Sequence, residues 1–157
     1  MIGICDWGIG GLGLLKALRE SGSEVDVIYF SDAGFTPYGK VSKERLYERW
    51  LTVKKFFDDH GVDQVVVACN ALSTVVVPSG NVLTIASAVK TIVKQHQDSK
   101  LGIIGGVRTV ESGIYDLNFG HVSRIAQPLS ALVEKGLVNG EEVEACLLYT
   151  SDAADEG

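Results

Sequence analysis

Short apolar runs alternate with longer amphipathic stretches along the first part of the chain. The apolar runs are IGIC (2–5), VDVIYF (25–30) and QVVVAC (64–69), and a segment with helical character follows each of them. Apolar runs without polar alternation are typical of strands buried on both faces, as in a parallel sheet covered by helices. The pattern therefore predicts an α/β fold in three layers, with a parallel sheet flanked by helices.

The most regular helical pattern covers residues 42–60. Ser42 stands where an N-cap residue is expected, just before the periodic stretch. The apolar residues that a helix would place on one stripe are Leu46, Trp50, Val53, Phe56 and Phe57.

The strand and helix alternation begins again later in the chain. KLGIIGG (100–106) and HVSRIAQ (121–127) are expected to be strands, with a helical segment at 109–120 between them. Each part of the chain thus predicts a Rossmann-like or flavodoxin-like sheet with helices on its faces.

The polar stretch QHQDS (95–99) predicts a domain boundary. Residues 1–97 then form a first α/β domain and residues 98–145 part of a second. The last segment, CLLYTSDAADEG (146–157), lacks the periodicity of what precedes it and resembles the translated read-through of a sequencing adapter. We expect a non-native tail on a truncated gene product; a short disordered C-terminus is the alternative.

Composition excludes several classes of function. The net charge is −6 and no segment gathers Lys and Arg, which argues against nucleic-acid binding. No run approaches the ~18 apolar residues of a membrane span, and no leader pattern is present, so we expect a cytoplasmic protein. The three cysteines have no C-x-x-C spacing, which predicts free thiols and no metal site. The three histidines (His60, His96 and His121) share no ligand spacing and are expected at the surface.

A glycine-rich loop, G-I-G-G-L-G (8–13), follows the first predicted strand and leads into a helix. This is the context of a dinucleotide-binding loop, in which Asp32 would lie near the ribose. Asp6 would repel a pyrophosphate there and Trp7 would crowd the turn, so a loop that packs tightly or holds a substrate carboxylate is the favoured interpretation. Dinucleotide binding stays open as an alternative.

Two further loops fall at the carboxyl ends of predicted strands, where ligands bind in open α/β sheets. Cys69 and Asn70 end the third apolar run, as Asp6 ends the first, so these side chains are expected to face one crevice. The turn Thr36-Pro37-Tyr38-Gly39 (36–39) follows the second run and could offer backbone N–H groups and a tyrosine hydroxyl to a substrate carboxylate. Cys5, inside the first run, is expected to pack in the core.

Taken together, the loops DWGIGG (6–11), PYG (37–39) and VVACN (66–70) resemble those of the aspartate/glutamate racemase family, and glutamate racemase most closely. In that family they read D-S-G-V-G-G, P-Y-G and V-V-A-C-N-T. The resemblance continues through GIIGGVRTVESGIY (102–115) and AQPLSALVEKG (126–136), so it covers nearly all of the chain before the tail.

The resemblance implies a two-domain isomerase that needs no cofactor and no metal and has a small amino acid as its partner. Two opposed cysteines would interconvert L- and D-glutamate, because inversion needs deprotonation on one face and reprotonation on the other. Cys69 matches the first thiol, and Asp6 would assist its protonation state. The substrate would be held by Asp6, Trp7, Pro37, Tyr38, Gly39, Asn70 and Ala71. The family also implies a role in peptidoglycan synthesis and cell shape, and a possible homodimer.

The sequence departs from the family in three places. The second cysteine of the family lies in a C-T-H segment that does not occur here, and Cys146 is not part of one, so we expect the fragment alone to be inactive. Trp7 stands where the family has Ser and Ala71 where it has Thr, and both changes remove a hydroxyl. A superfamily relative with another substrate, or a binding domain without catalysis, therefore remains an alternative.

Overall fold

The chain folds into two compact units, Met1–Ile92 and Val93–Gly157. The structure, a computed structural model, describes residues 1–96, 98–116 and 121–152, with side chains through residue 148. The division falls a few residues before the boundary that the polar stretch predicts.

The first unit is built on a four-stranded parallel sheet with the order β2-β1-β3-β4. The strands are β1 (Ile2–Asp6), β2 (Val27–Ser31), β3 (Gln64–Val67) and β4 (Val82–Thr84). The predicted parallel sheet is confirmed, and its order is the flavodoxin-like one. The sequence pattern did not predict β4, since its three residues are too few to show a period.

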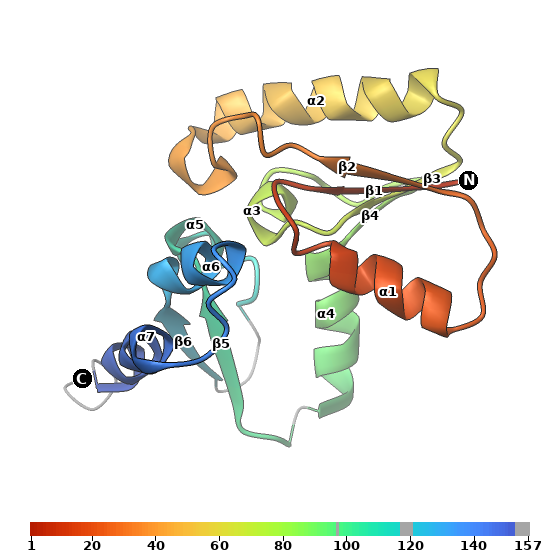
Figure 1. Cartoon of the computed structure of the whole chain (residues 1–157). Helices are drawn as coiled ribbons and strands as arrows, with labels where there is room; N and C mark the ends of the chain where they lie inside the picture. Colours follow the sequence, from red (N-terminus) through yellow and green to blue (C-terminus); the bar gives the residue numbers. More distant parts are fainter. Residues whose placement is uncertain (97, 117–120, 153–157) are drawn as a thin grey trace. The chain divides into compact units, whose positions relative to one another are not determined.

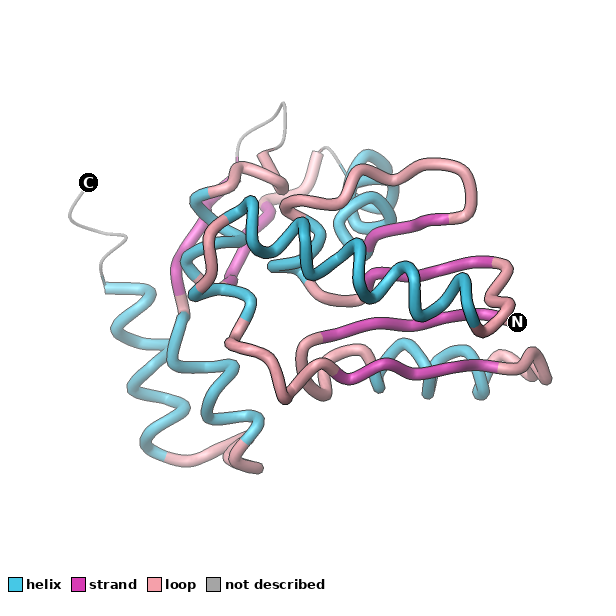
Figure 2. Tube along the Cα trace, turned by 90° about the horizontal axis from the view of Figure 1, so that it is seen from above, coloured by secondary structure: helices cyan, strands magenta, loops and turns pink. Residues whose placement is uncertain are grey.

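Helices cover both faces of this sheet (Figure 1). α2 (Lys43–Asp59) runs along one face, while α1 (Leu12–Glu20) and α4 (Ile85–Val93) lie on the other. Two short helices complete the unit, η1 (Tyr38–Lys40) and α3 (Asn70–Ser73), while η2 (Lys94–His96) lies just beyond it in the sequence. Seen from above, α2 follows the direction of the strands beneath it (Figure 2). The predicted three layers are therefore present in this unit.

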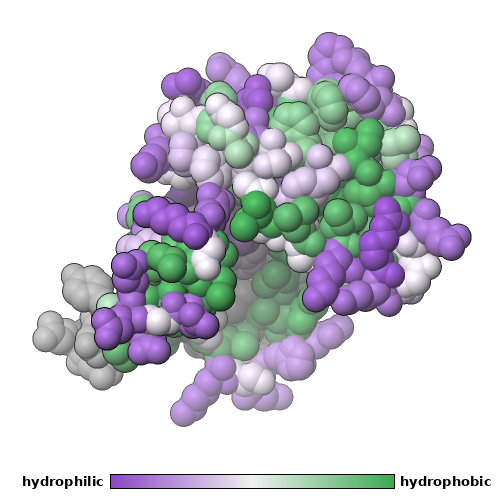
Figure 3. All heavy atoms as spheres, in the orientation of Figure 1, coloured by the Kyte–Doolittle hydropathy of each residue, from purple (hydrophilic) through white to green (hydrophobic). Residues whose placement is uncertain are grey.

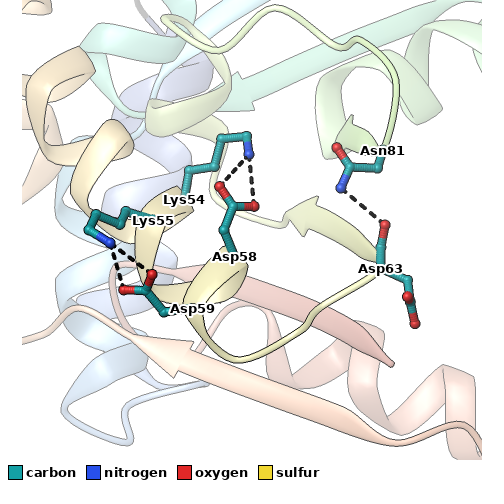
Figure 4. Close-up of polar contacts among 6 residues, drawn as sticks. All are labelled: Lys54, Lys55, Asp58, Asp59, Asp63 and Asn81. Carbon is teal, nitrogen blue, oxygen red and sulfur yellow. Dashed lines mark hydrogen bonds and ion pairs between the residues drawn. The ribbon is translucent and has the colours of Figure 1, made fainter.

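The sequence of α2 accounts for both its start and its packing. Ser42 is the N-cap, and its hydroxyl accepts a hydrogen bond from the Arg45 N–H at 3.2 Å. The predicted stripe is buried against the sheet, with Phe56 less covered than its other members. The outer side of the last turns carries two exposed ion pairs of i, i+4 spacing, Lys54–Asp58 and Lys55–Asp59 (Figure 4). Such pairs add little to stability, so the buried stripe is what holds the helix in place.

A side-chain contact fixes the entrance to β4. The Asn81 amide donates to the Asp63 carbonyl at 3.0 Å, as Figure 4 shows. Next to it, the Val65 N–H donates to the Asn81 carbonyl at 2.8 Å. These bonds join the chain before β4 to the start of β3, and so a three-residue strand is held at the edge of the sheet.

The face of the first unit that α1 covers is less completely packed. α1 has no fully buried residue, and the adjacent side chains of Ile9 and Leu12 are about half exposed. Figure 3 shows apolar atoms gathered beneath the sheet in this view. The well-packed core of the unit therefore lies on the α2 side.

The second unit contains a two-stranded parallel sheet of β5 (Leu101–Gly105) and β6 (His121–Ile125). Its helices are α5 (Val107–Glu111), α6 (Gln127–Glu134) and α7 (Glu141–Asp152). Both strands expected here are confirmed.

Two expectations for the second unit meet a different outcome. The helix expected over 109–120 is wrong in extent, because α5 ends at Glu111 and Gly113 follows with a φ of +65°; residues 117–120 lie outside the described part. The segment 146–157 was set apart as a tail, yet α7 continues through it to Asp152. Residues 153–157 lie outside the described part, and a foreign origin of this segment stays a prediction.

Gly3 is a position at which the core admits no side chain. A Cβ there would lie 2.7 Å from two ring carbons of Phe57 and 3.0 Å from Val62. We expect Gly3→Ala to lower the free energy of unfolding by about 1–3 kcal/mol, the usual range for overpacking. Gly13→Ala is the control, because a Cβ on Gly13 meets nothing within 4 Å and alanine favours the helix, so stability should be unchanged or slightly higher. Urea unfolding followed by tryptophan fluorescence reports on this unit, which holds both Trp7 and Trp50; equal stabilities of the two variants would contradict the packing described.

Candidate active site

The carboxyl ends of β1 and β3 bring the first candidate residues together. The two strands pair in parallel with Cys5 opposite Val67, and the Ala68 N–H donates to the Cys5 carbonyl at 2.9 Å. Asp6 therefore ends β1 beside Cys69, which follows β3. In the order β2-β1-β3 this is the switch point of the sheet, where ligands bind in open α/β folds.

The Asp6 side chain is buried, with 8% exposed, and its carboxylate accepts hydrogen bonds from the α1 loop and from the candidate catalytic thiol. Its Oδ2 accepts the Gly11 N–H at 3.1 Å, and its carboxylate also bonds the Cys69 thiol. Gly11 is the N-cap of α1, so an amide that would face a phosphate in a dinucleotide-binding loop is already bonded to a carboxylate. This arrangement disfavours the dinucleotide alternative.

Cys69 is a buried thiol, 9% exposed, at the N-cap of α3. Burial and the negative charge of Asp6 raise the pKa of Cys69 to about 12. Backbone N–H groups of Leu72 and Trp7 bond its sulfur and act in the opposite direction. The thiol is therefore protonated at neutral pH, with a carboxylate in position to accept its proton. Cys5 is fully buried in the core, as expected.

Trp7 links its own loop to the one that follows β2. Its indole N–H donates to the Phe35 carbonyl at 2.9 Å, and the ring is partly buried against the core. The indole donor is thus taken by the protein. The sequence analysis expected Trp7 among the substrate-binding residues, and the structure leaves its backbone, not its side-chain N–H, beside Cys69.

The Tyr38 hydroxyl is also engaged within the protein. It donates to Asp32 Oδ2 at 2.5 Å, and Tyr38 itself is buried. Burial, together with this bond and the charge of Asp32, raises the pKa of Tyr38 well above its usual value. The proton of this hydroxyl is thus used within the protein, and binding of a substrate by Tyr38 stays a prediction.

Asp32 is 4% exposed and forms a two-pronged ion pair with Arg49 of α2. Arg49 Nε donates to Oδ2 at 2.8 Å and Nη2 donates to Oδ1 at 2.5 Å. A carboxylate committed in this way is not available to a ribose, which further disfavours dinucleotide binding. The sequence analysis missed Arg49, since an arginine on an amphipathic helix gives no signal of a partner 17 residues earlier.

The remaining expected residues lie around Cys69. η1, which includes Tyr38 and Gly39 and follows Pro37, packs against α3. α3 begins with Asn70, which is exposed, and Ala71, which is partly buried. The exposed Gly39 N–H donates no hydrogen bond within the described part of the chain. The loops named from the sequence are thus neighbours at one edge of the sheet.

The histidines and the second unit show no competing centre. His60 and His96 are exposed as expected, but His121 is not a surface residue, since its side chain is 16% exposed and lies 4.0 Å from Asp116. His121 and Asp116 line a small cavity of about 220 Å³ in the second unit.

Across the described residues, no cluster of three or more His, Cys, Asp or Glu could hold a metal ion. None of the described helices has the length and apolar character that a membrane span requires.

The chain is similar to known racemases in both sequence and structure, although no family model matches it. Glutamate racemase of Aquifex pyrophilus is 39% identical over 154 residues, which is 89% of this chain and 60% of the relative. The structure of Thermus thermophilus glutamate racemase in complex with β-chloro-D-alanine is 31% identical with a TM-score of 0.77, over 87% of this chain and 55% of that one. Francisella tularensis glutamate racemase in complex with D-glutamate is 28% identical with a TM-score of 0.82, over 92% and 60%.

The chain is thus similar to glutamate racemases over most of its own length. The resemblance seen in three short loops thus extends over most of the sequence and over the fold. The chain spans about 60% of the length of the curated relatives that it matches. The two positions that differ from the family's loops now have a structural setting. The Trp7 indole N–H donates to the Phe35 carbonyl, and Ala71 is the second residue of α3.

The charge of Asp6 should control the ionisation of Cys69. Asp6→Asn keeps an oxygen that can accept the Gly11 N–H but removes the negative charge, so we expect the pKa of Cys69 to fall. The thiolate fraction rises about tenfold for each pKa unit, and alkylation of Cys69 at pH 9 should accelerate accordingly. Peptide mass spectrometry reports on this cysteine alone. Asp59→Asn, at an exposed carboxylate on α2, should leave the rate unchanged; an unchanged rate in Asp6→Asn would contradict the assigned coupling.

Proposed function

We propose that this chain supplies the first thiol of a cofactor-independent amino-acid racemase, an isomerase that interconverts L- and D-glutamate. The observation that carries the proposal is the buried Asp6–Cys69 pair at the switch point of the sheet. Similarity to glutamate racemases supports the choice of reaction, and the D-glutamate bound to the Francisella tularensis relative supports the choice of substrate.

The geometry supports a defined proton path. Cys69 is protonated at rest and bonded to Asp6, which accepts the thiol proton as substrate enters. The N–H groups of Trp7 and Leu72 then stabilise the thiolate, which removes the α-proton. In the proposal the exposed Gly39 N–H donates to a substrate carboxylate, and Asn70 binds the substrate from the neighbouring loop. In this scheme Tyr38, Pro37 and Ala71 shape the pocket.

Inversion requires a second acid or base on the opposite face of the α-carbon. The sequence has two other cysteines, Cys5 in the core and Cys146 on α7. Neither is in a loop like that of Cys69. A protein with Cys69 alone would remove and return a proton on one face, and would thus exchange the α-proton of one enantiomer without inverting it.

A second candidate is a related racemase with another substrate. Trp7 and Ala71 remove two hydroxyls from the loops around Cys69, and the indole N–H is bonded to Phe35. Fewer donors near the substrate would change the preference among amino acids. In either case we propose that the protein works in the cytoplasm, because three free cysteines fit a reducing compartment. The D-glutamate that it makes would serve peptidoglycan synthesis. We propose a homodimer as its assembly.

The deciding experiment measures α-proton exchange in heavy water by nuclear magnetic resonance, with D- and L-glutamate and D- and L-aspartate. Inactivity of the fragment as a racemase leaves exchange on one face possible, so we expect α-proton exchange of one glutamate enantiomer without inversion. This exchange should be lost in Cys69→Ser and retained in Cys146→Ser. Exchange of both enantiomers with inversion indicates a second acid or base, and exchange of one indicates Cys69 alone. Exchange that persists in Cys69→Ser would contradict the proposal, and a preference for aspartate would favour the second candidate.

A further inference from the structure

Arg49 stands apart from the other charged residues of α2 because its partner is buried. Its guanidinium is 27% exposed and meets the carboxylate of Asp32, which is almost fully covered. The Lys54 and Lys55 pairs of the same helix lie at the surface. Without Arg49 the buried negative charge of Asp32 would have no positive partner, which is unfavourable. Arg49 therefore stabilises Asp32 in its buried position.

Asp32 in turn contacts two parts of the candidate site. Its carboxylate accepts the Tyr38 hydroxyl at 2.5 Å, and its backbone N–H donates to the Asp6 carbonyl at 3.0 Å. The same residue thus holds the start of η1 and the end of β1. The loop between Asp32 and Tyr38 is closed further by the Phe35 N–H, which donates to the Asp32 carbonyl at 2.9 Å.

Arg45 offers a natural comparison on the same helix. Both guanidinium groups lie over the Phe35 ring, Arg45 at 5.4 Å and Arg49 at 5.0 Å from the centroid. Arg45 is exposed and its backbone N–H donates the helix-capping bond to Ser42, whereas the Arg49 guanidinium binds Asp32. The two arginines share the ring contact and differ in the ion pair.

We propose that Arg49 is a positioning residue of the candidate active site, which acts through Asp32 to fix Tyr38 and, with it, the neighbouring exposed Gly39 N–H. The role in binding rests on the function proposed above, while the anchoring of the loop does not. Neither Arg49 nor Asp32 touches the reacting atoms. The Tyr38 hydroxyl, which was expected to bind substrate, instead binds Asp32, and Arg49 holds Asp32 in place.

Amide hydrogen exchange tests the anchoring in the 157-residue chain itself. The reporters are the Lys40 N–H, bonded to the Pro37 carbonyl at 2.8 Å, and the Phe35 N–H. We expect both N–H groups to exchange at least fivefold faster in Arg49→Met than in the unchanged chain. The exchange rates in Arg49→Lys should be intermediate, since lysine keeps the positive charge but cannot form the two parallel hydrogen bonds of a guanidinium. Arg45→Met is the matched control and should exchange like the unchanged chain. The Ala68 N–H, bonded to Cys5 between the strands, should be equally protected in all four proteins.

Two results would overturn the anchoring role. One is equal exchange at Lys40 in Arg49→Met and Arg45→Met, and the other is an equal acceleration at Lys40 and Ala68, which would mean that Arg49 only supports the fold. If Arg49→Met does not fold, Tyr38→Phe and Arg49→Lys decide the question. Tyr38→Phe removes the hydroxyl, and with it the bond to Asp32 and the interaction with Arg49, while the Arg49–Asp32 ion pair stays. It should release Lys40 without affecting Ala68; protection of Lys40 in both variants would overturn the proposal.

A glutamate titration, followed on the Gly39 amide resonance, tests the consequence for binding. The half-saturating concentration should rise at least fivefold in Arg49→Met and stay the same in Arg45→Met. Equal values in the unchanged chain and Arg49→Met would overturn the positioning role. A Gly39 resonance that does not respond to glutamate in the unchanged chain would contradict the proposed function, while the exchange rates would still decide the anchoring.

Discussion

The parallel pairing of β1 with β3 is the constraint on which the candidate site depends. Because Cys5 lies opposite Val67 and accepts the Ala68 N–H, the next residues of the two strands must leave the sheet side by side. Asp6 is the last residue of β1, and Cys69 comes directly after Ala68 where the chain leaves β3. A slip of one residue in either strand would turn one of the two side chains to the other face of the sheet. The packing of Phe57 against Gly3, which leaves no space for a side chain, helps to hold this register.

The same burial that brings the thiol and the carboxylate together opposes their ionisation. Desolvation and the charge of Asp6 keep Cys69 protonated, and two backbone N–H groups only partly offset them. A thiolate would thus form only when a proton acceptor and a substrate are both present. Such a pair is protected from unspecific reaction with solutes, since the thiolate is the reactive form.

Side chains that a family resemblance assigns to substrate are here bonded to the protein. The indole N–H of Trp7 binds Phe35, and the Tyr38 hydroxyl binds Asp32, which Arg49 holds. The three loops around Cys69 are therefore joined to one another and to α2. What they leave for a ligand near Cys69 is mainly backbone, with the exposed Gly39 and Asn70 at the edge. A rigid frame of this kind orients a small substrate at little entropic cost.

The sequence by itself determined β1, β2, β3, β5 and β6, together with the helix at 42–60 and the three loops. These features depend on local periodicity and on turn residues that act over a few positions. It also indicated that Asp6 and Cys69 share an edge, since parallel strands end on the same side. Only the tertiary structure decided which donors are already used. The bonds from Arg49 to Asp32, from Tyr38 to Asp32 and from Trp7 to Phe35 join residues of separate elements through side-chain geometry, and no local pattern encodes such pairs. β4 was missed for a related reason, because its three residues are held by Asn81 and β3 and not by a period of their own.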